Sequence, residues 1–265
     1  MIKNIWPDRF LLKGKISVVT GGTGLVGKGV VTGLAQAGSK VIIGDIDKEN
    51  GLKLEEECKK NDLDVTWKKL DITNLSSIKT LINELIKIHN KIDVWVNLAY
   101  PRTKDWGNKF EDVEYNSLKK NVDMHMNGYL ICCQQIAEQM KKQKQGSIIN
   151  FGSIYGIVGP DFSIYKGTDM TMAAAYAAIK GGIINFTRYL ATYYGEYGVR
   201  VNAVCPGSVA DKQPLEFVKN YTMKTPLKRL GTTEEMACPV IFLASDAASY
   251  ITGHILMVDG GWTAW

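Results

Sequence analysis

Short runs of apolar, mostly β-branched residues recur along this chain and alternate with stretches in which apolar residues follow the helical spacing. The short runs are continuous rather than alternating, which is typical of strands covered on both faces. They predict strands at residues 16–20, 41–45, 65–70, 92–97, 147–151, 199–204 and 255–259. The longer stretches predict helices at residues 26–37, 75–88, 118–140, 173–194 and 233–243. Because this alternation requires right-handed crossovers, we predict an α/β fold, a doubly wound parallel sheet of about seven strands with helices on both faces.

Polar residues and glycines mark the ends of the predicted helices. Asn74 and Thr232 stand at N-cap positions, and Gly38 stands where a helix should stop. Neither a change in composition nor a Pro/Gly linker nor an internal repeat interrupts the pattern. We therefore expect a single domain over residues 1–265.

Two long segments depart from the alternation of strands and helices. Residues 99–116 and 154–175 contain glycines, prolines and aromatic residues, and each follows a predicted strand. Loops of this length are uncommon in a compact domain and are usually functional. Ligands of open α/β sheets bind at the carboxyl ends of the strands, so we predict that both segments are substrate loops.

The composition is that of a folded chain, with 45% apolar residues, 22% charged residues and a formal net charge of +5. No apolar run is long enough to span a membrane, and the segment from Met1 to Lys15 lacks the apolar core of a secretory signal. The lysines are scattered, and their one short cluster falls at a predicted helix end, where cations are favourable. We expect no nucleic-acid partner, no membrane partner and a cytoplasmic location.

The 5 cysteines have no C-x-x-C spacing, and most have apolar neighbours. We interpret them as reduced, buried thiols of a cytosolic protein. They are Cys58, Cys132, Cys133, Cys205 and Cys238. His89 and His254 have no carboxylate or thiol at metal-ligand spacing, so we expect no metal site.

The first predicted strand leads into the glycine-rich turn Thr20-Gly21-Gly22-Thr23-Gly24-Leu25-Val26-Gly27 and then into a helix. Glycines allow the backbone to approach a pyrophosphate, and a helix N-terminus supplies amide donors and a partial positive charge. The turn therefore indicates a dinucleotide site, with a purely structural tight turn as the alternative.

The second predicted strand ends at Asp45, near the spacing at which an acid binds the adenosine ribose. A carboxylate accepts a hydrogen bond from the 2′-hydroxyl and repels a 2′-phosphate, so Asp45 favours NAD(H) over NADP(H). In the alternative interpretation Asp45 only caps the helix that begins near Lys48, although Asp47 could also be that cap.

Tyr176 and Lys180 are four residues apart in a predicted helix, so their side chains emerge on one face. A free phenol has a pKa of about 10 and is a poor proton donor or acceptor at neutral pH. A nearby ammonium favours the phenolate, which lowers that pKa and makes the tyrosine a general acid/base. Ser153 follows the strand at 147–151 and could hold a substrate oxygen. The alternatives are a surface Tyr–Lys pair and a simple turn serine.

Taken together and in this order, these motifs resemble those of the short-chain dehydrogenase/reductases over essentially the whole chain. The resemblance rests on the glycine turn, Asp45, Leu70-Asp71, Val96-Asn97-Leu98-Ala99, Gly152-Ser153, Tyr176 with Lys180, Asn202 to Pro206-Gly207 and Val258-Asp259-Gly260-Gly261. Within that superfamily, residues 97–103, Ser153-Ile154-Tyr155-Gly156 and residues 159–176 resemble bacterial oxidoreductases of flagellin modification and nonulosonic-acid synthesis.

The resemblance implies a single-domain Rossmann fold and a role for each matching residue. Ser153 would polarise the substrate oxygen, Tyr176 would exchange the proton, and Lys180 would lower the tyrosine pKa while binding the nicotinamide ribose. The cofactor would contact Gly21, Thr23, Gly24, Val26, Gly27, Asp45, Asp71, Ile72, Asn97, Ala99, Tyr176, Lys180, Pro206, Gly207 and Val209.

Two departures from the family pattern concern the backbone turns. Leu25 replaces the middle glycine of the first turn, and Gly24 stands one place earlier, a spacing more common in sugar-nucleotide epimerases. The family sequence Asn-Asn-Ala-Gly becomes Asn97-Leu98-Ala99-Tyr100, which places Tyr100 near the expected substrate.

A third departure puts His125 where the family has an asparagine of the proton relay. A neutral imidazole could bridge Lys180 and water as the amide does, and its pKa near neutrality suits a relay. His125 is otherwise a satisfied core residue, and Asn121, one helical turn earlier, is the competing candidate.

We expect an oxidoreductase that transfers a hydride between NAD(H) and a secondary alcohol or ketone, on a sugar or sugar-nucleotide of bacterial glycan biosynthesis. Polar residues of the two loops suggest such a small-molecule substrate, phosphorylated or nucleotide-linked. They are Arg102, Lys104, Asp161, Tyr165 and Lys166. The alternatives are a sugar epimerase or dehydratase with retained NAD, and a non-catalytic NAD-sensing binding protein.

The C-terminal stretch, residues 244–265, is unusually apolar for a chain end. Its large apolar residues are Tyr250, Ile251, Met257, Trp262 and Trp265. Leaving such a side chain in water forgoes roughly 1.5–3 kcal/mol. We therefore expect a homo-oligomer, a tetramer or a dimer, unless the stretch packs on its own core.

Overall fold

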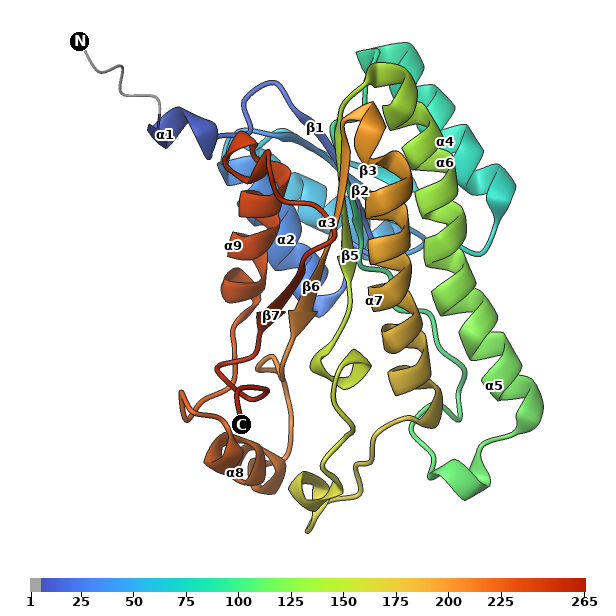
Figure 1. The fold of residues 1–265 in the computed structure, drawn as a ribbon, viewed down its shortest axis with the longest axis vertical. Coiled ribbons are helices and arrows are strands. Elements are labelled where there is room, and N and C mark those ends of the chain that lie inside the picture. Colours follow the sequence, from blue (N-terminus) through green and yellow to red (C-terminus); the bar gives the residue numbers. More distant parts are fainter. Residues whose placement is uncertain (1–5) are drawn as a thin grey trace.

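The strands of the computed structural model, which describes residues 6–265, form one parallel sheet in the order β3-β2-β1-β4-β5-β6-β7 (Figure 1). The strands are β1 (Ile16–Thr20), β2 (Lys40–Asp45), β3 (Val65–Lys69), β4 (Val94–Asn97), β5 (Gly146–Phe151), β6 (Val199–Pro206) and β7 (Ile255–Val258). The predicted doubly wound sheet is confirmed. Because all seven strands run parallel, their carboxyl ends meet at one edge of the sheet.

Helices cover both faces of the sheet (Figure 1). One face packs against α2 (Leu25–Gln36), α3 (Lys48–Lys59) and α9 (Thr233–Ala244), the other against α4 (Leu75–His89), α6 (Gly128–Gln143) and α7 (Ala174–Tyr194). The remaining α-helices of the described chain are α1 (Trp6–Arg9), α5 (Tyr115–Asn121) and α8 (Leu215–Lys224). Each face has its own buried apolar cluster, which explains why the strands are apolar without alternation.

The predicted helix ends are confirmed. Asn74 caps α4 by accepting from the backbone N–H of Ser77 at 3.1 Å. Thr232 and Glu235 form a reciprocal capping box at the start of α9. Gly38 follows α2 with a φ of +98°, a left-handed conformation that only glycine adopts without strain.

The stretch predicted as one helix over residues 118–140 is instead three consecutive elements. It contains α5, a π-helix over Val122–Asn127 and α6. The π-helix adds one residue to a turn, which rotates the following residues and brings His125 into the core.

Two expectations about buried side chains need correction. Cys238 is exposed on α9, whereas the other 4 cysteines are buried as predicted. Trp262 is buried within its own chain, because its ring stacks on Tyr221 with the centroids 4.2 Å apart. Tyr250 and Trp265 remain exposed. No helix of the described chain is long and apolar enough to cross a membrane. The first five residues of the segment from Met1 to Lys15 lie outside the described part.

Candidate active site

Apart from Tyr176 and Lys180 of α7, the residues predicted to bind a dinucleotide lie at or just beyond the carboxyl ends of strands. The connection from β1 into α2 contains Gly21, Thr23, Gly24, Val26 and Gly27, and β2 ends at Asp45. The strand β3 is followed by Asp71 and Ile72, and β4 ends at Asn97, with Ala99 two residues later. The end of β6 holds Pro206, and Gly207 and Val209 follow it. The sheet order makes β1 and β4 neighbours, so the chain reverses direction across the sheet between them. Dinucleotides bind at such a switch point in open α/β folds.

The glycine turn leaves the start of α2 open to an anion. Gly24 is the N-cap of α2, and no side chain caps the helix there. A Cβ on Gly27 would lie 2.3 Å from the carbonyl oxygen of Gly21, so this position requires glycine. Uncapped amide groups and the positive end of the helix dipole suit a pyrophosphate. These residues therefore fit a dinucleotide cofactor.

Asp45 is held beside the glycine turn. Its carboxylate accepts hydrogen bonds from the N–H of Thr23 at 3.1 Å and the hydroxyl of Thr23 at 2.7 Å. It also accepts from the N–H of Asp47 at 3.0 Å, whereas the N-cap of α3 is Asp47 itself. The next residue, Ile46, is 67% exposed and apolar. The alternative in which Asp45 caps the helix is therefore wrong, and the residue is free to face a ribose.

Two polar side chains join the central strands at this edge. Thr20 accepts from the backbone N–H groups of Leu98 at 3.0 Å and Ala99 at 3.2 Å. The fully buried amide of Asn97 donates to Asn150 on β5 at 2.9 Å. The end of β4 is thereby fixed against both of its neighbours, which agrees with the predicted supporting role of Asn97.

Asp71 and Ile72 shape the turn after β3. The carboxylate of Asp71 accepts from the N–H of Thr73 at 2.9 Å and from its hydroxyl at 2.7 Å. Ile72 is buried, and a Cβ on Gly128 would lie 2.9 Å from it. The structure places both residues at the sheet edge, while their predicted contact with adenine stays a prediction.

Ser153 and Tyr176 line one pocket of about 280 Å³, together with Pro206 and Gly207. Ser153 follows β5 and begins a 3₁₀ turn, in which its hydroxyl oxygen accepts from the N–H of Tyr155 at 3.2 Å. Tyr176 lies in the first turn of α7. The structure thus brings the predicted serine and tyrosine to the same cavity at the carboxyl edge of the sheet.

Lys180 lies one turn further along α7 and is buried. Its ammonium donates to the carbonyl oxygen of Phe151 at 2.7 Å, and its Nζ lies 3.3 Å from Nε2 of His125. The Nζ is 5.6 Å from the centroid of the Tyr176 ring. Burial lowers the pKa of Lys180 to about 7, so this lysine exchanges its proton near neutral pH.

The predicted lowering of the Tyr176 pKa needs correction for the protein without cofactor. Burial raises the pKa of Tyr176, and the neighbouring Ser153 hydroxyl lowers it by a smaller amount. The nearest partners of the Lys180 ammonium are Phe151 and His125 rather than the phenol oxygen. Desolvation of both groups disfavours the phenolate and the ammonium alike, and it outweighs the attraction expected from their spacing in the helix.

His125, not Asn121, is the residue that meets Lys180. The side chain of Asn121 accepts from the N–H of Thr103 at 2.9 Å and donates to the hydroxyl of Thr103 at 2.8 Å, so it anchors the first substrate loop. His125 is fully buried, and burial lowers its pKa to about 2, which keeps the imidazole neutral. Its Nδ1 has no hydrogen-bond partner among the described residues.

Tyr100 lies against Tyr176, the predicted acid/base, as its position suggested. The Tyr100 ring meets Tyr176 edge-on at 5.9 Å and His125 edge-on at 5.2 Å between centroids. Trp106 donates from Nε1 to the Tyr100 hydroxyl at 2.8 Å and lies 6.2 Å from Tyr176. Sequence reasoning missed Trp106, for which the only signal was an aromatic residue inside a predicted substrate loop.

Most of the polar loop residues expected near the substrate do not line this pocket. The expected residues were Arg102, Lys104, Asp161, Tyr165 and Lys166, and only Tyr165 contributes to the pocket wall. Asp161 pairs with Lys224 of α8, and the Arg102 guanidinium lies 5.3 Å from the centroid of the Tyr100 ring. Asp161 and Arg102, two of the charged loop residues that suggested a charged substrate, therefore interact with other side chains and do not line the pocket.

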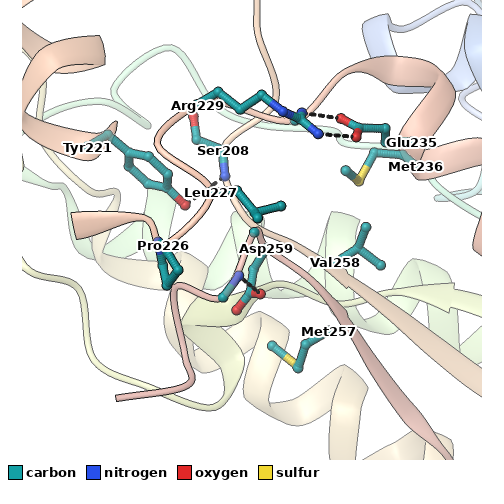
Figure 2. A pocket seen from close by; sticks show the side chains of 13 residues that line it. Ser208, Tyr221, Pro226, Leu227, Arg229, Glu235, Met236, Met257, Val258 and Asp259 are labelled. Carbon is teal, nitrogen blue, oxygen red and sulfur yellow. Dashed lines mark hydrogen bonds and ion pairs between the residues drawn. The ribbon is translucent and has the colours of Figure 1, made fainter. Parts of the chain in front are cut away.

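A larger cavity of about 440 Å³ borders the pocket but holds none of the proton-transfer residues (Figure 2). Arg229 there forms a two-pronged ion pair with Glu235, with N–O distances of 2.7 and 2.6 Å. Asp259 accepts three hydrogen bonds from the C-terminal turn that follows it. Ser208 and Tyr221 line both cavities and separate them. Arg229 and Glu235 of the larger cavity are thus paired with each other, Asp259 is hydrogen-bonded, and the predicted proton-transfer residues line the smaller cavity.

Comparison with known proteins adds family relationships to this geometry. The family model described as enoyl-(acyl carrier protein) reductase matches residues 24–263. The post-translational flagellin modification protein A of Campylobacter coli is 33% identical over 95% of this chain and 99% of that protein. A D-xylose 1-dehydrogenase of Caulobacter vibrioides is 34% identical over 99% of this chain and 100% of that protein.

Solved structures of similar fold carry different cofactors. The crystal structure of gox2181 superposes with a TM-score of 0.90 at 32% identity, over 98% of this chain and 100% of that chain. A short chain dehydrogenase from Leptospira borgpetersenii with bound NAD⁺ gives 0.83 at 32% identity, over 99% and 97% of the two chains. A gluconate 5-dehydrogenase from Burkholderia cenocepacia in complex with NADP and tartrate gives 0.87 at 25% identity, over 97% and 98%.

Proposed function

The chain belongs to the short-chain dehydrogenase/reductase family and is an oxidoreductase of that family, and we propose that it transfers a hydride between NAD(H) and a secondary alcohol or ketone of a sugar. One observation carries the proposal. Ser153 and Tyr176 line one pocket at the carboxyl edge of the sheet, and the buried Lys180–His125 pair lies one turn of α7 beyond Tyr176. The glycine turn and Asp45 lie at the same edge of the sheet.

Each of these side chains has a distinct part in the reaction. Ser153 donates a hydrogen bond to the substrate oxygen and holds it beside the phenol. In the reducing direction Tyr176 gives its proton to that oxygen, and in the oxidising direction it takes the proton back. Bound NAD(H) would supply or accept the hydride. Lys180 holds a positive charge close to the phenol and favours the phenolate left after proton donation.

His125 continues the proton path from Lys180. Its neutral Nε2 accepts from the ammonium, and the proton on Nδ1 is then the one without a protein partner among the described residues. The pKa of His125 lies far below the near-neutral value expected from the sequence, so the imidazole passes a proton only by accepting at Nε2 while it releases at Nδ1, without becoming charged. His125 thus replaces the asparagine of the family relay with a group that itself exchanges protons.

The surroundings of Asp45 support a preference for NAD(H). The buried carboxylate forms no ion pair with any described residue, so its negative charge is available to repel a 2′-phosphate. The neighbouring Ile46 offers no cation to such a phosphate. The two cofactor-bound structures contain NAD⁺ and NADP respectively, so the preference rests on these two residues.

The sugar assignment is supported by the relatives. One is named a flagellin modification protein and another a D-xylose 1-dehydrogenase. A carbohydrate substrate fits the second name, and a role in bacterial glycan biosynthesis fits the first.

The test is a turnover assay with purified protein, NADH or NADPH, and a panel of keto-sugars. We expect NADH to be consumed in proportion to the alcohol formed, with a lower kcat/KM for NADPH. Conversion of sugar with no net change in NADH would instead indicate an epimerase or dehydratase with retained NAD. Cofactor binding without turnover of any compound would indicate a non-catalytic sensor.

A further inference from the structure

The pocket above Tyr176 has no charged side chain among its lining residues. Much of its wall is aromatic or thioether, formed by Tyr100, Trp106, Tyr155, Met170, Met172 and Phe217. Hydrogen-bonding groups of the wall are neutral as well, and they include Thr171, Ser208 and Gln213. A ligand that fills this space therefore meets apolar surface and uncharged donors and acceptors.

Two of the nearby charged side chains, Asp161 and Arg102, interact with other groups. Asp161 accepts from the N–H of Ser163 at 2.9 Å and pairs with Lys224. Arg102 stacks over the Tyr100 ring and is not part of the pocket lining. An ionised group carried into the pocket would lose hydration without gaining a counter-charge, which is strongly unfavourable.

Tyr100 and Trp106 make a fixed wall beside the reactive phenol. Their rings meet edge-on with centroids 5.6 Å apart, and the indole N–H donates to the Tyr100 hydroxyl at 2.8 Å. Both rings also contact the Tyr176 ring. The indole polar group is satisfied by this bond, so the pair presents hydrocarbon surface at the place where the reacting carbon must lie.

The size of the pocket limits the ligand as well. Its volume of about 280 Å³ lies just below the range of roughly 300–1,000 Å³ that small-molecule sites span. Pro206 and Gly207 of its lining are assigned to the cofactor, so the space left for the substrate is smaller still. A single saturated ring with one apolar face and hydroxyl or amide substituents matches both the volume and the lining.

We propose that the substrate is an uncharged, unphosphorylated single saturated ring, and that Tyr100 and Trp106 determine this specificity by packing against the ring. The proposal rests on the proposed oxidoreductase function and narrows its substrate. It excludes a phosphate or carboxylate on the reacting ring, so the phosphorylated sugar suggested by the loop composition is not the ligand of this pocket.

The test uses two ring ketones of nearly equal shape, 4-oxocyclohexanecarboxamide and 4-oxocyclohexanecarboxylate, with NADH at pH 7. The amide is neutral and the carboxylate is ionised, so charge is the main difference between them. We expect kcat/KM to be at least tenfold higher for the amide. We also expect the amide, but not the carboxylate, to raise the Tm of the NADH complex.

Variants of Tyr100 and Trp106 test whether these two residues determine the substrate selectivity. Trp106→Ala and Tyr100→Gly should raise KM for the amide at least fivefold and leave the Kd of NADH unchanged. Phe110→Ala, an exposed position of the same loop that does not line the pocket, is the control and should change neither value.

The outcomes separate the two proposals. Equal or better use of the carboxylate, absence of binding by both ketones to a protein that binds NADH, or wall variants that behave like Phe110→Ala would overturn the substrate proposal alone. A protein that fails to bind NADH would overturn the proposed function and the substrate proposal with it.

Discussion

The proposed preference for NAD(H) over NADP(H) depends on two adjacent side chains, Asp45 and Ile46. Replacing them with the pair Asp45→Ser and Ile46→Arg removes the repelling carboxylate and adds a guanidinium suited to a phosphate. We predict that the ratio of kcat/KM for NADH to that for NADPH falls by roughly tenfold or more, equivalent to about 1.4 kcal/mol. Steady-state kinetics with both cofactors measures it, and an unchanged ratio would show that the 2′-position lies elsewhere.

His125 makes the free energy of unfolding depend on pH below about 6.5. Burial lowers the pKa of this histidine from its ordinary value of 6.5 to about 2, so below pH 6.5 the unfolded state binds a proton that the folded state does not. Stability from this group is full above pH 6.5 and declines as the pH falls from there toward 2. At pH 5 the loss amounts to about 2 kcal/mol.

The variant His125→Asn removes this titration and keeps a polar side chain of the kind that the family has at this position. We predict that, between pH 7 and pH 5, its free energy of unfolding falls by about 2 kcal/mol less than that of the wild type. Urea denaturation at the two pH values tests this. Parallel losses in both proteins would mean that the folded protein protonates His125 readily.

At the scale of elements, the connection from β1 into α2 depends on one close approach. A Cβ on Gly27 would lie 2.3 Å from the carbonyl oxygen of Gly21, whereas a Cβ on Gly24 would lie 3.4 Å from its nearest neighbour. We predict that Gly27→Ala lowers stability by roughly 1–3 kcal/mol and weakens NADH binding. The matched variant Gly24→Ala should lose less than about 1 kcal/mol of stability. Thermal unfolding and NADH titration of both variants check this, and equal losses would remove the steric explanation.

The elements differ in how well the sequence predicts them. Strands such as β1 and β5 were predictable because helices cover both faces, so that most positions are apolar. Their few polar side chains form buried hydrogen bonds, as Ser147 does with Leu243 of α9 and Asn150 with Thr187 of α7. The helix α8 was not predicted, because only Phe217 and Tyr221 of its residues are buried and the apolar pattern is short. The π-helix before α6 was missed because side-chain spacing does not distinguish a one-residue insertion from a regular helix.

The features of the candidate site also differ in how well the sequence predicts them. The convergence of Ser153 and Tyr176 followed from their places after β5 and at the start of α7. The direction of the Tyr176 pKa did not follow, because burial depends on how the loops close over the ring. The contact of Trp106 with Tyr100 was equally beyond the sequence, since no periodic pattern orients side chains within an irregular loop.

At the scale of the whole molecule, apolar side chains remain uncovered. Tyr250 and Trp265 near the C-terminus are 102% and 80% exposed, and Tyr189 and Tyr193 on α7 are 57% and 54% exposed. We predict a homo-oligomer, because burying such side chains yields roughly 1.5–3 kcal/mol each. Light scattering coupled to size exclusion should give a mass at least twice the 29.4 kDa of one chain. A monomer at micromolar concentration would contradict the expectation.

The central claim is that the phenol of Tyr176 passes the proton to the substrate oxygen. The most direct measurement is the single-turnover rate of NADH oxidation by a reducible ring ketone, for the wild type and for Tyr176→Phe, with the Kd of NADH measured for both. We predict a rate lower by roughly 10²–10⁴-fold in the variant, with a Kd that stays the same. A variant that oxidises NADH at the wild-type rate would contradict it.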